Sequence, residues 1–258
     1  MTDKARTTVH FVGAGPGAPD LITVRGAEFL KRAQVVIYAG SLVNPALLEY
    51  CPAAKVYNSA TLTLGEIVAI VEAASRAGLE VVRLHTGDPS VYGAIREQMD
   101  ELDKLGIGYD TCPGVTACFG AAASLDLEYT LPGVSQSLVI TRMAGRTEVP
   151  PLESVESFAA HQASMAIYLS ASAVDKLAER LIAGGYSPET PAAIVYKATW
   201  PDEKKIVCTI SRLADAAREN HITKTALILV GDAIEPSRYE KSRLYAADFS
   251  TEFRKASE

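Results

Sequence analysis

Residues 9–26 read VHFVGAGPGAPDLITVRG, and this stretch decides the fold. The apolar run 9–12 predicts a buried strand, and residues 21–33 show the apolar spacing of a helix. Glycines at 13, 15 and 17 separate the two. A strand, a glycine-rich turn and a helix in this order predict the first βα unit of a parallel sheet.

The same alternation continues through the first half of the chain. Ser90 is expected to cap a helix that ends at Gly106. Further strands are predicted at 34–39, 79–87 and 107–111, and further helices at 65–78 and 115–125. The predicted fold class is therefore α/β, with a parallel, doubly wound N-terminal sheet.

The pattern pauses at residues 126–133, DLEYTLPG, which show no clear periodicity. We therefore predict two α/β domains, residues 1–130 and 131–258. Ser172 and Asp175 are expected to form a capping box that opens a helix over 173–183. Strands are predicted at 137–142, 164–170, 192–198, 205–210 and 225–231, and a hairpin among them makes the C-terminal sheet mixed.

Composition limits the classes of function. The chain has 258 residues, a net charge of −6 and an isoelectric point near 5.4, so nucleic acid is not expected as a partner. No signal peptide or membrane-spanning run is visible, and a cytoplasmic protein is expected. Four cysteines without a CxxC pair and four scattered histidines give no sign of a metal site.

The glycine loop allows several interpretations. GAGPGA fits the dinucleotide fingerprint G-x-G-x-x-G/A and follows a predicted strand. However, Pro16, Pro19 and Asp20 delay the helix whose N-terminus would bind a pyrophosphate. The next strand ends at Tyr38 and Ala39 without the carboxylate that would bind a ribose. A nucleotide-like ligand, with NAD as its less favoured case, and a plain turn with positive-φ glycines remain open.

Two further loops are expected at the same edge of the sheet. HTGDPSVYG (85–93) and PGVTA (113–117) each follow a predicted strand, and open α/β sheets bind ligands at the carboxyl ends of their strands. Small residues would let a ligand approach the backbone closely. Asp88 either contributes a carboxylate to this site or fixes the turn before Pro89.

Taken in order, VGAGPGAPDLITVRG, VVIYAGSLVNPALL, HTGDPSVYGAI and PGVTA resemble the tetrapyrrole methylase family. AGSLVNPALL and TRMAGRTEVP are most similar to the branch that methylates precorrin-4 at C11 in cobalamin biosynthesis. The resemblance implies two α/β domains with a cleft between them, a homodimer, and S-adenosylmethionine (SAM) as methyl donor. It implies a tetrapyrrole as substrate and S-adenosylhomocysteine (SAH) as product.

The resemblance also implies site residues. Arg142 and Arg146 are the expected contacts to substrate carboxylates, with solvated loop arginines as the alternative. Tyr92 would line the substrate site or belong to the core. Weaker candidates for the substrate carboxylates are Arg25, Arg83 and Arg96, because arginines of helices and strands are expected at the surface. The implied cofactor contacts are Pro16, Thr86, Gly87, Asp88, Val91, Thr116, Ala117, Leu169, Ala198, Thr225 and Ala226.

One position departs from the family pattern. Some members carry an Asp directly after the strand tyrosine, whereas Tyr38 is followed by Ala39 here. No general base is therefore assigned, and uroporphyrinogen is disfavoured as substrate. An NAD-dependent oxidoreductase, a non-catalytic tetrapyrrole binder, a cobalt-containing precursor and another ring position remain as alternatives.

Overall fold

The computed structural model describes residues 8–256, and the chain divides into two compact units. The first unit comprises the chain up to Ala121 together with Lys197–Glu203, and the second comprises Ala122–Tyr196 together with the chain from Lys204 onward. The predicted division into domains after residue 130 stays a prediction.

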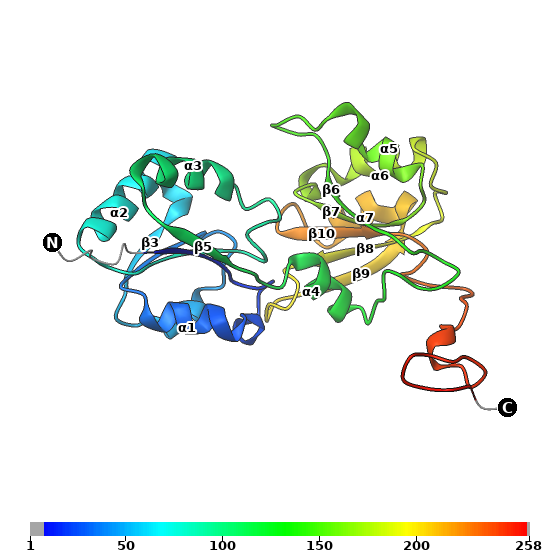
Figure 1. The fold of residues 1–258 in the computed structure, drawn as a ribbon. Helices are drawn as coiled ribbons and strands as arrows, with labels where there is room; N and C mark the ends of the chain where they lie inside the picture. The colour runs from blue at the N-terminus through cyan, green and yellow to red at the C-terminus, as the bar shows by residue number, and fades with distance from the viewer. Residues whose placement is uncertain (1–7, 257–258) are drawn as a thin grey trace. The chain divides into compact units, whose positions relative to one another are not determined.

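The first unit contains a fully parallel sheet in the order β3-β2-β4-β1-β5. Helices cover both faces, as the alternation of runs predicted (Figure 1). The strands β1, β2 and β4 are buried on both sides, so their sequences are apolar runs rather than alternating ones. The strands are β1 (Val9–Gly13), β2 (Val35–Tyr38), β3 (Lys55–Asn58), β4 (Val81–His85) and β5 (Tyr109–Cys112).

The helices of this unit separate onto the two faces. α1 (Val24–Arg32) packs with Val12 on one face, while α2 (Leu64–Arg76) and α3 (Ile95–Leu105) pack with Phe11 on the other. The connections after β1 and β4, which are neighbours in the sheet, therefore leave toward opposite faces. This is the topological switch point at which open α/β sheets bind their ligands.

Two local predictions in this unit were incomplete or wrong. The strand β3 was not predicted, because its four residues form the sheet edge and its side chains are mostly exposed. Ser90 does not cap α3, which begins at Ile95 after the left-handed residue Ala94. The end of α3 was predicted correctly, because Gly106 adopts φ 63° there.

The second unit contains a mixed sheet in the order β6-β7-β10-β8-β9. Only the β6–β7 pair is parallel, and β8 and β9 form the predicted antiparallel hairpin pair. One face packs against α5 (Val155–Ala159), α6 (Val174–Ala183) and α7 (Leu213–Glu219). The strands are β6 (Leu138–Arg142), β7 (Ser164–Tyr168), β8 (Pro191–Tyr196), β9 (Lys204–Thr209) and β10 (Ala226–Val230).

The expected capping box at Ser172 is wrong, because α6 begins after Ala173 without a side-chain cap. The C-terminal segment closes on itself, since Arg254 donates to the carbonyls of Leu244, Ala246 and Phe249.

Within residues 8–256 no helix has the length and apolar character that crossing a bilayer requires, and no group of side chains suits a metal ion.

Candidate functional site

Three glycine loops meet at the carboxyl edge of the first sheet, as predicted. A Cβ at Gly13 would lie 2.6 Å from the Gly114 Cα and from the Gly87 oxygen, and one at Gly114 would lie 2.2 Å from that oxygen. These backbones touch so closely that any side chain would force them apart. Gly87 also lies against Thr116 and Ala117, so the second and third predicted ligand loops are in contact.

The first loop uses its amide groups within the protein. Gly15 and Gly87 exchange two backbone hydrogen bonds of 3.2 and 2.8 Å. The Ala14 amide donates to the His85 carbonyl at 2.7 Å, and the Ala18 amide donates to the Thr199 hydroxyl at 2.9 Å. A phosphate-binding loop needs such amides directed at the ligand, and here three of them are already satisfied.

The helix after this loop is also placed unfavourably for a phosphate. α1 begins at Val24, and its first turn is capped by the Thr23 hydroxyl, which accepts from the Gly26 amide at 3.1 Å. A short 3₁₀ turn, Pro19–Leu21, intervenes between the glycines and the helix. The pyrophosphate arrangement of a dinucleotide-binding fold is therefore absent from this loop, which argues against the oxidoreductase alternative.

Asp88 holds two of the loops together. One carboxylate oxygen accepts from the Ser90 amide at 2.8 Å and from the Ser90 hydroxyl, and the other accepts from the Gly114 amide at 2.8 Å. Partial burial opposes the charged form of Asp88, but these hydrogen bonds outweigh it and lower the pKa of the carboxyl. The turn-forming interpretation of Asp88 is thus realised, and the residue also fixes the third loop against the second.

The turn after Asp88 is strained. Tyr92 and Ala94 adopt φ angles of 57° and 49°, which L-residues rarely do. A Cβ at Gly93, between them, would lie 2.1 Å from the Pro89 carbonyl oxygen. The turn leaves the Tyr92 side chain 44% exposed, so the core alternative for this residue is not realised. Such strain clusters at ligand-binding sites.

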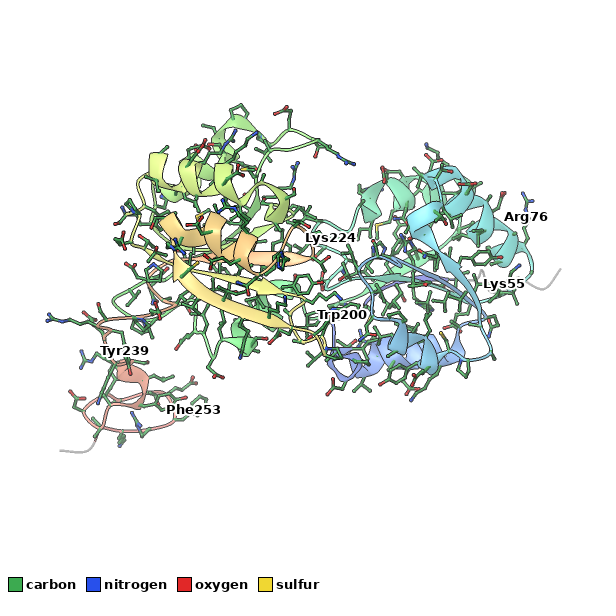
Figure 2. The ribbon with its side chains drawn as sticks, turned by 180° about the vertical axis from the view of Figure 1, so that it is seen from behind. Lys55, Arg76, Trp200, Lys224, Tyr239 and Phe253 are labelled. Atoms are coloured by element: carbon green, nitrogen blue, oxygen red, sulfur yellow. The ribbon has the colours of Figure 1, made fainter. Side chains whose placement is uncertain are left out.

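The segment Lys197–Glu203 packs onto the first loop (Figure 2 labels Trp200 within it). The Trp200 indole donates to the Pro16 carbonyl at 3.2 Å. A Cβ at Gly17 would lie 2.1 Å from the indole and 2.7 Å from the Ala198 carbonyl, so this glycine is required by packing. Pro16 also faces Gly120, where an added Cβ would lie 2.7 Å from the proline ring. Two predicted contacts, Pro16 and Ala198, are therefore neighbours.

Four further predicted contacts lie at one edge of the second sheet. β6 and β7 end there and β10 begins there, because β10 runs antiparallel to β7. This edge carries Arg142, Leu169, Thr225 and Ala226. Leu169 and Thr225 both have left-handed backbones, with φ 54° and 56°, and the Leu169 side chain is 68% exposed. Leu169 thus combines an exposed apolar side chain with a backbone conformation that costs free energy.

Arg142 organises the loop that follows β6. Its guanidinium donates to the carbonyls of Met143, Thr147 and Glu148 at 3.3, 3.1 and 2.7 Å. The loop is tied back to β7 through the Ser170 hydroxyl, which accepts from the Met143 amide at 3.0 Å. Arg146, between these anchor points, is exposed. Neither arginine forms an ion pair with a carboxylate within residues 8–256.

Several residues of this site had no signal in the sequence. Gly114, Thr199 and Trp200 act through contacts with residues 26 to 184 positions away, and no local sequence pattern predicts such contacts. The predicted surface position of Arg83 is wrong, because the residue is only 6% exposed. β4 is buried on both faces, so its central arginine cannot reach solvent.

Comparisons with known proteins agree with these features. Residues 8–214 match the family described as Tetrapyrrole (Corrin/Porphyrin) Methylases. A Methanocaldococcus jannaschii protein named cobalt-precorrin-4 C(11)-methyltransferase is 51% identical over 249 residues, covering 96% of this chain and 96% of the relative.

Two solved structures are similar in fold. A cobalt precorrin-4 methyltransferase, described as a cobalamin biosynthetic enzyme, matches with a TM-score of 0.88 and 43% identity, over 92% of this chain and 99% of that chain. A uroporphyrin-III C-methyltransferase from Thermus thermophilus, complexed with S-adenyl homocysteine, matches with a TM-score of 0.75 and 27% identity, over 91% and 96% of the two chains.

Proposed function

The chain belongs to the tetrapyrrole (corrin/porphyrin) methylase family, and we propose that it transfers a methyl group from SAM to C11 of a precorrin-4 macrocycle. The observation that carries this proposal is the glycine-lined edge of the first sheet. Its backbones touch at Gly13, Gly87 and Gly114, and its first-loop amides are satisfied internally. Such an edge suits a nucleoside without phosphate.

The residues at this edge fit SAM in their chemistry. Pro16, Gly87, Val91 and Ala117 are small or apolar, so recognition would depend on shape and on backbone groups. When bound, SAM supplies a methyl group on a cationic sulfur, which makes that carbon electrophilic. We infer that SAM is also contacted by Thr86, Asp88, Thr116 and Ala198 of the first unit and by Leu169, Thr225 and Ala226 of the second.

Asp88 would act on binding rather than on the bond-forming step. Both of its carboxylate oxygens already accept hydrogen bonds from Ser90 and Gly114. It therefore holds the second and third loops in one arrangement. Holding two reactants in a productive orientation can lower a barrier by about 7–11 kcal/mol, so a site without an assigned general base is chemically sufficient.

The acceptor side of the proposal depends on arginine. A corrin precursor carries several carboxylates, and Arg142 and Arg146 have no carboxylate partner in the described chain. Arginine binds carboxylates with two parallel hydrogen bonds. Because three carbonyls already occupy Arg142, Arg146 is the more available of the two. Tyr92 would contact the macrocycle with its exposed ring.

The choice between a cobalt-containing and a metal-free substrate rests on the names of the relatives. The M. jannaschii relative and the solved structure at 43% identity both carry cobalt-precorrin-4 in their names, which favours the cobalt-containing substrate over the metal-free one. A homodimer in the cytoplasm belongs to the same proposal.

The proposal is tested by incubating the protein with methyl-labelled SAM and a panel of precorrins with and without cobalt. We expect one labelled methyl at C11, located by NMR, and the highest rate with cobalt-precorrin-4. Binding of SAH without any labelled product would favour the non-catalytic binder. A rise in Tm with NAD but not with SAH would favour an oxidoreductase.

A further inference from the structure

Arg83 carries its charge into the interior of the first unit. It lies on the sheet face covered by α2 and α3, and both Arg83 and Gln98 of α3 are only 6% exposed. The small cavity beside them is lined by Val9, Phe11, Ile67, Val68, Val71 and Leu102. An arginine at the centre of a buried strand is unusual, because taking a charged side chain out of water costs free energy.

The partners of Arg83 form a relay toward the strained turn. Its Nε donates to the Gln98 Oε1 at 3.0 Å, and its Nη1 donates to the Ile37 carbonyl at 3.2 Å. The Gln98 Nε2 then donates to the Ala94 carbonyl at 3.0 Å. The chain of contacts therefore runs from a buried cation, through one side-chain amide, to the residue that precedes α3.

These hydrogen bonds around Arg83 are not expected to stabilise the folded state. Burial lowers the pKa of Arg83 to about 10, so the guanidinium is still protonated at neutral pH, and its hydrogen-bond partners are uncharged. The neighbouring His85 has its pKa lowered to about 3 by burial and by the charge of Arg83, so it stays neutral. Even a buried ion pair can often be replaced by apolar residues with no loss of stability, and Arg83 lacks a counterion among residues 8–256.

The relay ends at a turn whose backbone needs to be held. Ala94 and Tyr92 both have positive φ, and Gly93 between them is pressed against the Pro89 carbonyl. Non-glycine residues in this conformation persist only where their surroundings over-determine it. The Gln98 amide supplies such a restraint by fixing the Ala94 carbonyl directly.

We propose that Arg83 and Gln98 are positioning residues that hold the turn Ser90–Ala94 in its left-handed form and thereby direct the Tyr92 ring toward the macrocycle. Arg83 fixes the orientation of the Gln98 amide, so that its N–H side faces Ala94. The inference rests on the proposed function for the identity of the ligand, and on the hydrogen bonds for the restraint itself.

The sharpest test is Gln98→Glu. The carboxylate keeps the size of the side chain and gives Arg83 a counterion, but it cannot donate to the Ala94 carbonyl. We expect an unchanged or higher Tm, hydrogen exchange at the amides of residues 91–94 at least about tenfold faster, and an acceptor KM raised about fivefold with kcat changed less than about twofold.

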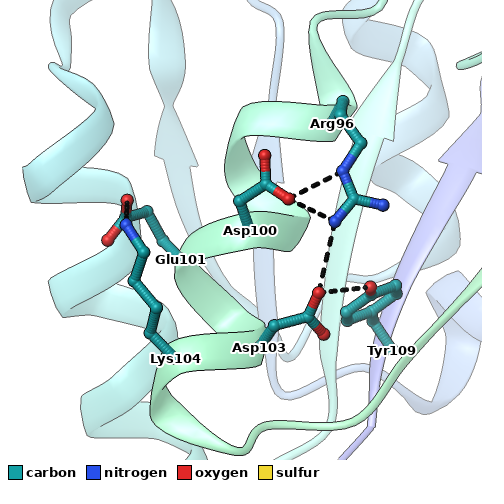
Figure 3. A network of polar contacts seen from close by, with 6 residues as sticks. All are labelled: Arg96, Asp100, Glu101, Asp103, Lys104 and Tyr109. Atoms are coloured by element: carbon teal, nitrogen blue, oxygen red, sulfur yellow. Dashed lines mark hydrogen bonds and ion pairs between the residues drawn. The ribbon is translucent and has the colours of Figure 1, made fainter.

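Arg96→Ala is the matched control on the same helix. Arg96 is exposed and forms ion pairs with Asp100 and Asp103, and Tyr109 donates to Asp103 (Figure 3). Removing it should leave the exchange at residues 91–94 and the acceptor KM as in the unaltered protein. A Tm for Gln98→Glu lower than that of Arg96→Ala would contradict the proposal, as would unchanged exchange.

Rescue by glycine separates a restraint on the turn from a general loss of structure. Glycine adopts φ 49° without strain, so Ala94→Gly in the Gln98→Glu background should return the acceptor KM to within about twofold of the unaltered protein. A double variant as poor as Gln98→Glu alone would overturn the proposal. If no variant and no unaltered protein methylates a precorrin, the proposed function fails while the exchange result still decides the relay.

Discussion

The two sheet edges that carry the predicted ligand contacts are built in opposite ways. At the first, glycine backbones touch, and the contacts are shaped by the absence of side chains at Gly13, Gly87 and Gly114. At the second, the predicted contacts are non-glycine residues, and Leu169 and Arg146 are exposed to solvent. The first edge thus offers shape, while the second offers side-chain chemistry.

The difference matches the two ligands of the proposed function. In that proposal the first edge would recognise a nucleoside without phosphate by fit and by backbone groups. The second edge would offer Arg142 and Arg146 to the carboxylates of the macrocycle. Changes where the glycine backbones touch at the first edge should therefore affect cofactor binding and stability together, whereas changes at the two arginines of the second edge should affect the acceptor alone.

The largest effect is expected from Gly114→Ala. Its Cβ would lie 2.2 Å from the Gly87 oxygen and 2.7 Å from the Gly13 Cα, and backbone atoms cannot move aside cheaply. We expect a loss of about 3 kcal/mol in the free energy of unfolding, a Tm lower by about 6 to 12 °C, and SAH affinity reduced at least about 100-fold. Differential scanning calorimetry and titration calorimetry measure these.

Gly65→Ala serves as the control for this change. Gly65 lies in α2 with no atom within 4 Å of an added Cβ, so alanine there should raise stability by about 0.5–1 kcal/mol and leave SAH binding unchanged. Equal SAH affinity in the two variants would show that the contact of glycine backbones does not form the cofactor site.

The next effect is expected from Asp88→Asn. The amide cannot accept on both sides, so one contact, to Ser90 or to Gly114, becomes unfavourable. Titration calorimetry should show SAH affinity reduced about 30-fold, while Asp100→Asn on the surface of α3 should show no reduction.

The stability difference between Asp88→Asn and the unaltered protein should depend on pH in a defined way. Because the folded pKa of Asp88 lies below the ordinary 3.8, its contribution to stability is present above pH 3.8 and is lost as the pH falls through the lower folded value. The difference in Tm between Asp88→Asn and the unaltered protein should therefore be constant from about pH 5 to 8. A difference that already shrinks between pH 8 and 6 would contradict the assignment.

A smaller effect, confined to the acceptor, is expected from Arg146→Ala. Loss of one charge-assisted contact should raise the tetrapyrrole KM about tenfold and leave SAH affinity and Tm unchanged. Arg142→Ala should raise the same KM and also release the loop, because three carbonyls lose their donor. Trypsin should then cleave after Arg146 faster than in the unaltered protein. A fall in SAH affinity with Arg146→Ala would remove the distinction between the two edges.

The smallest effect is expected from Trp200→Phe. The change removes the hydrogen bond to the Pro16 carbonyl but keeps most of the packing against Gly17. SAH affinity should fall about threefold, in line with the net value of one hydrogen bond. Because Trp200 is the one tryptophan of the chain, SAH should also change the fluorescence of the unaltered protein. Constant fluorescence at saturating SAH would place the cofactor away from Pro16.

Local signals in the sequence explain which parts of the fold could be predicted. The apolar runs of β1, β2 and β4 and the αL glycine after α3 were sufficient to predict a parallel sheet and the end of a helix. The exposed edge strand β3 has no comparable apolar run and was missed. Ser90 has the right residue type for a helix cap. Its amide and hydroxyl donate to the Asp88 carboxylate, however, and its side chain does not cap α3.

The site was predictable where it depends on loops after strands and unpredictable where it depends on distant contacts. The meeting of the three glycine loops follows from the parallel topology alone. The packing of Trp200 on Gly17 and the burial of Arg83 depend on tertiary structure. The residues next to Trp200 and Arg83 in the sequence do not predict this packing or this burial. The cofactor and the ring position were predicted from the resemblance to a family, because composition, periodicity and spacing carry no information about them.

The most direct test of the central claim is hydrogen exchange of the unaltered protein with and without SAH. We predict slower exchange in residues 13–18, 86–92 and 114–118 of the first edge, together with 169–170 and 225–226 of the second. Exchange that is unchanged in the three glycine loops, or slowed only elsewhere in the chain, would contradict the account.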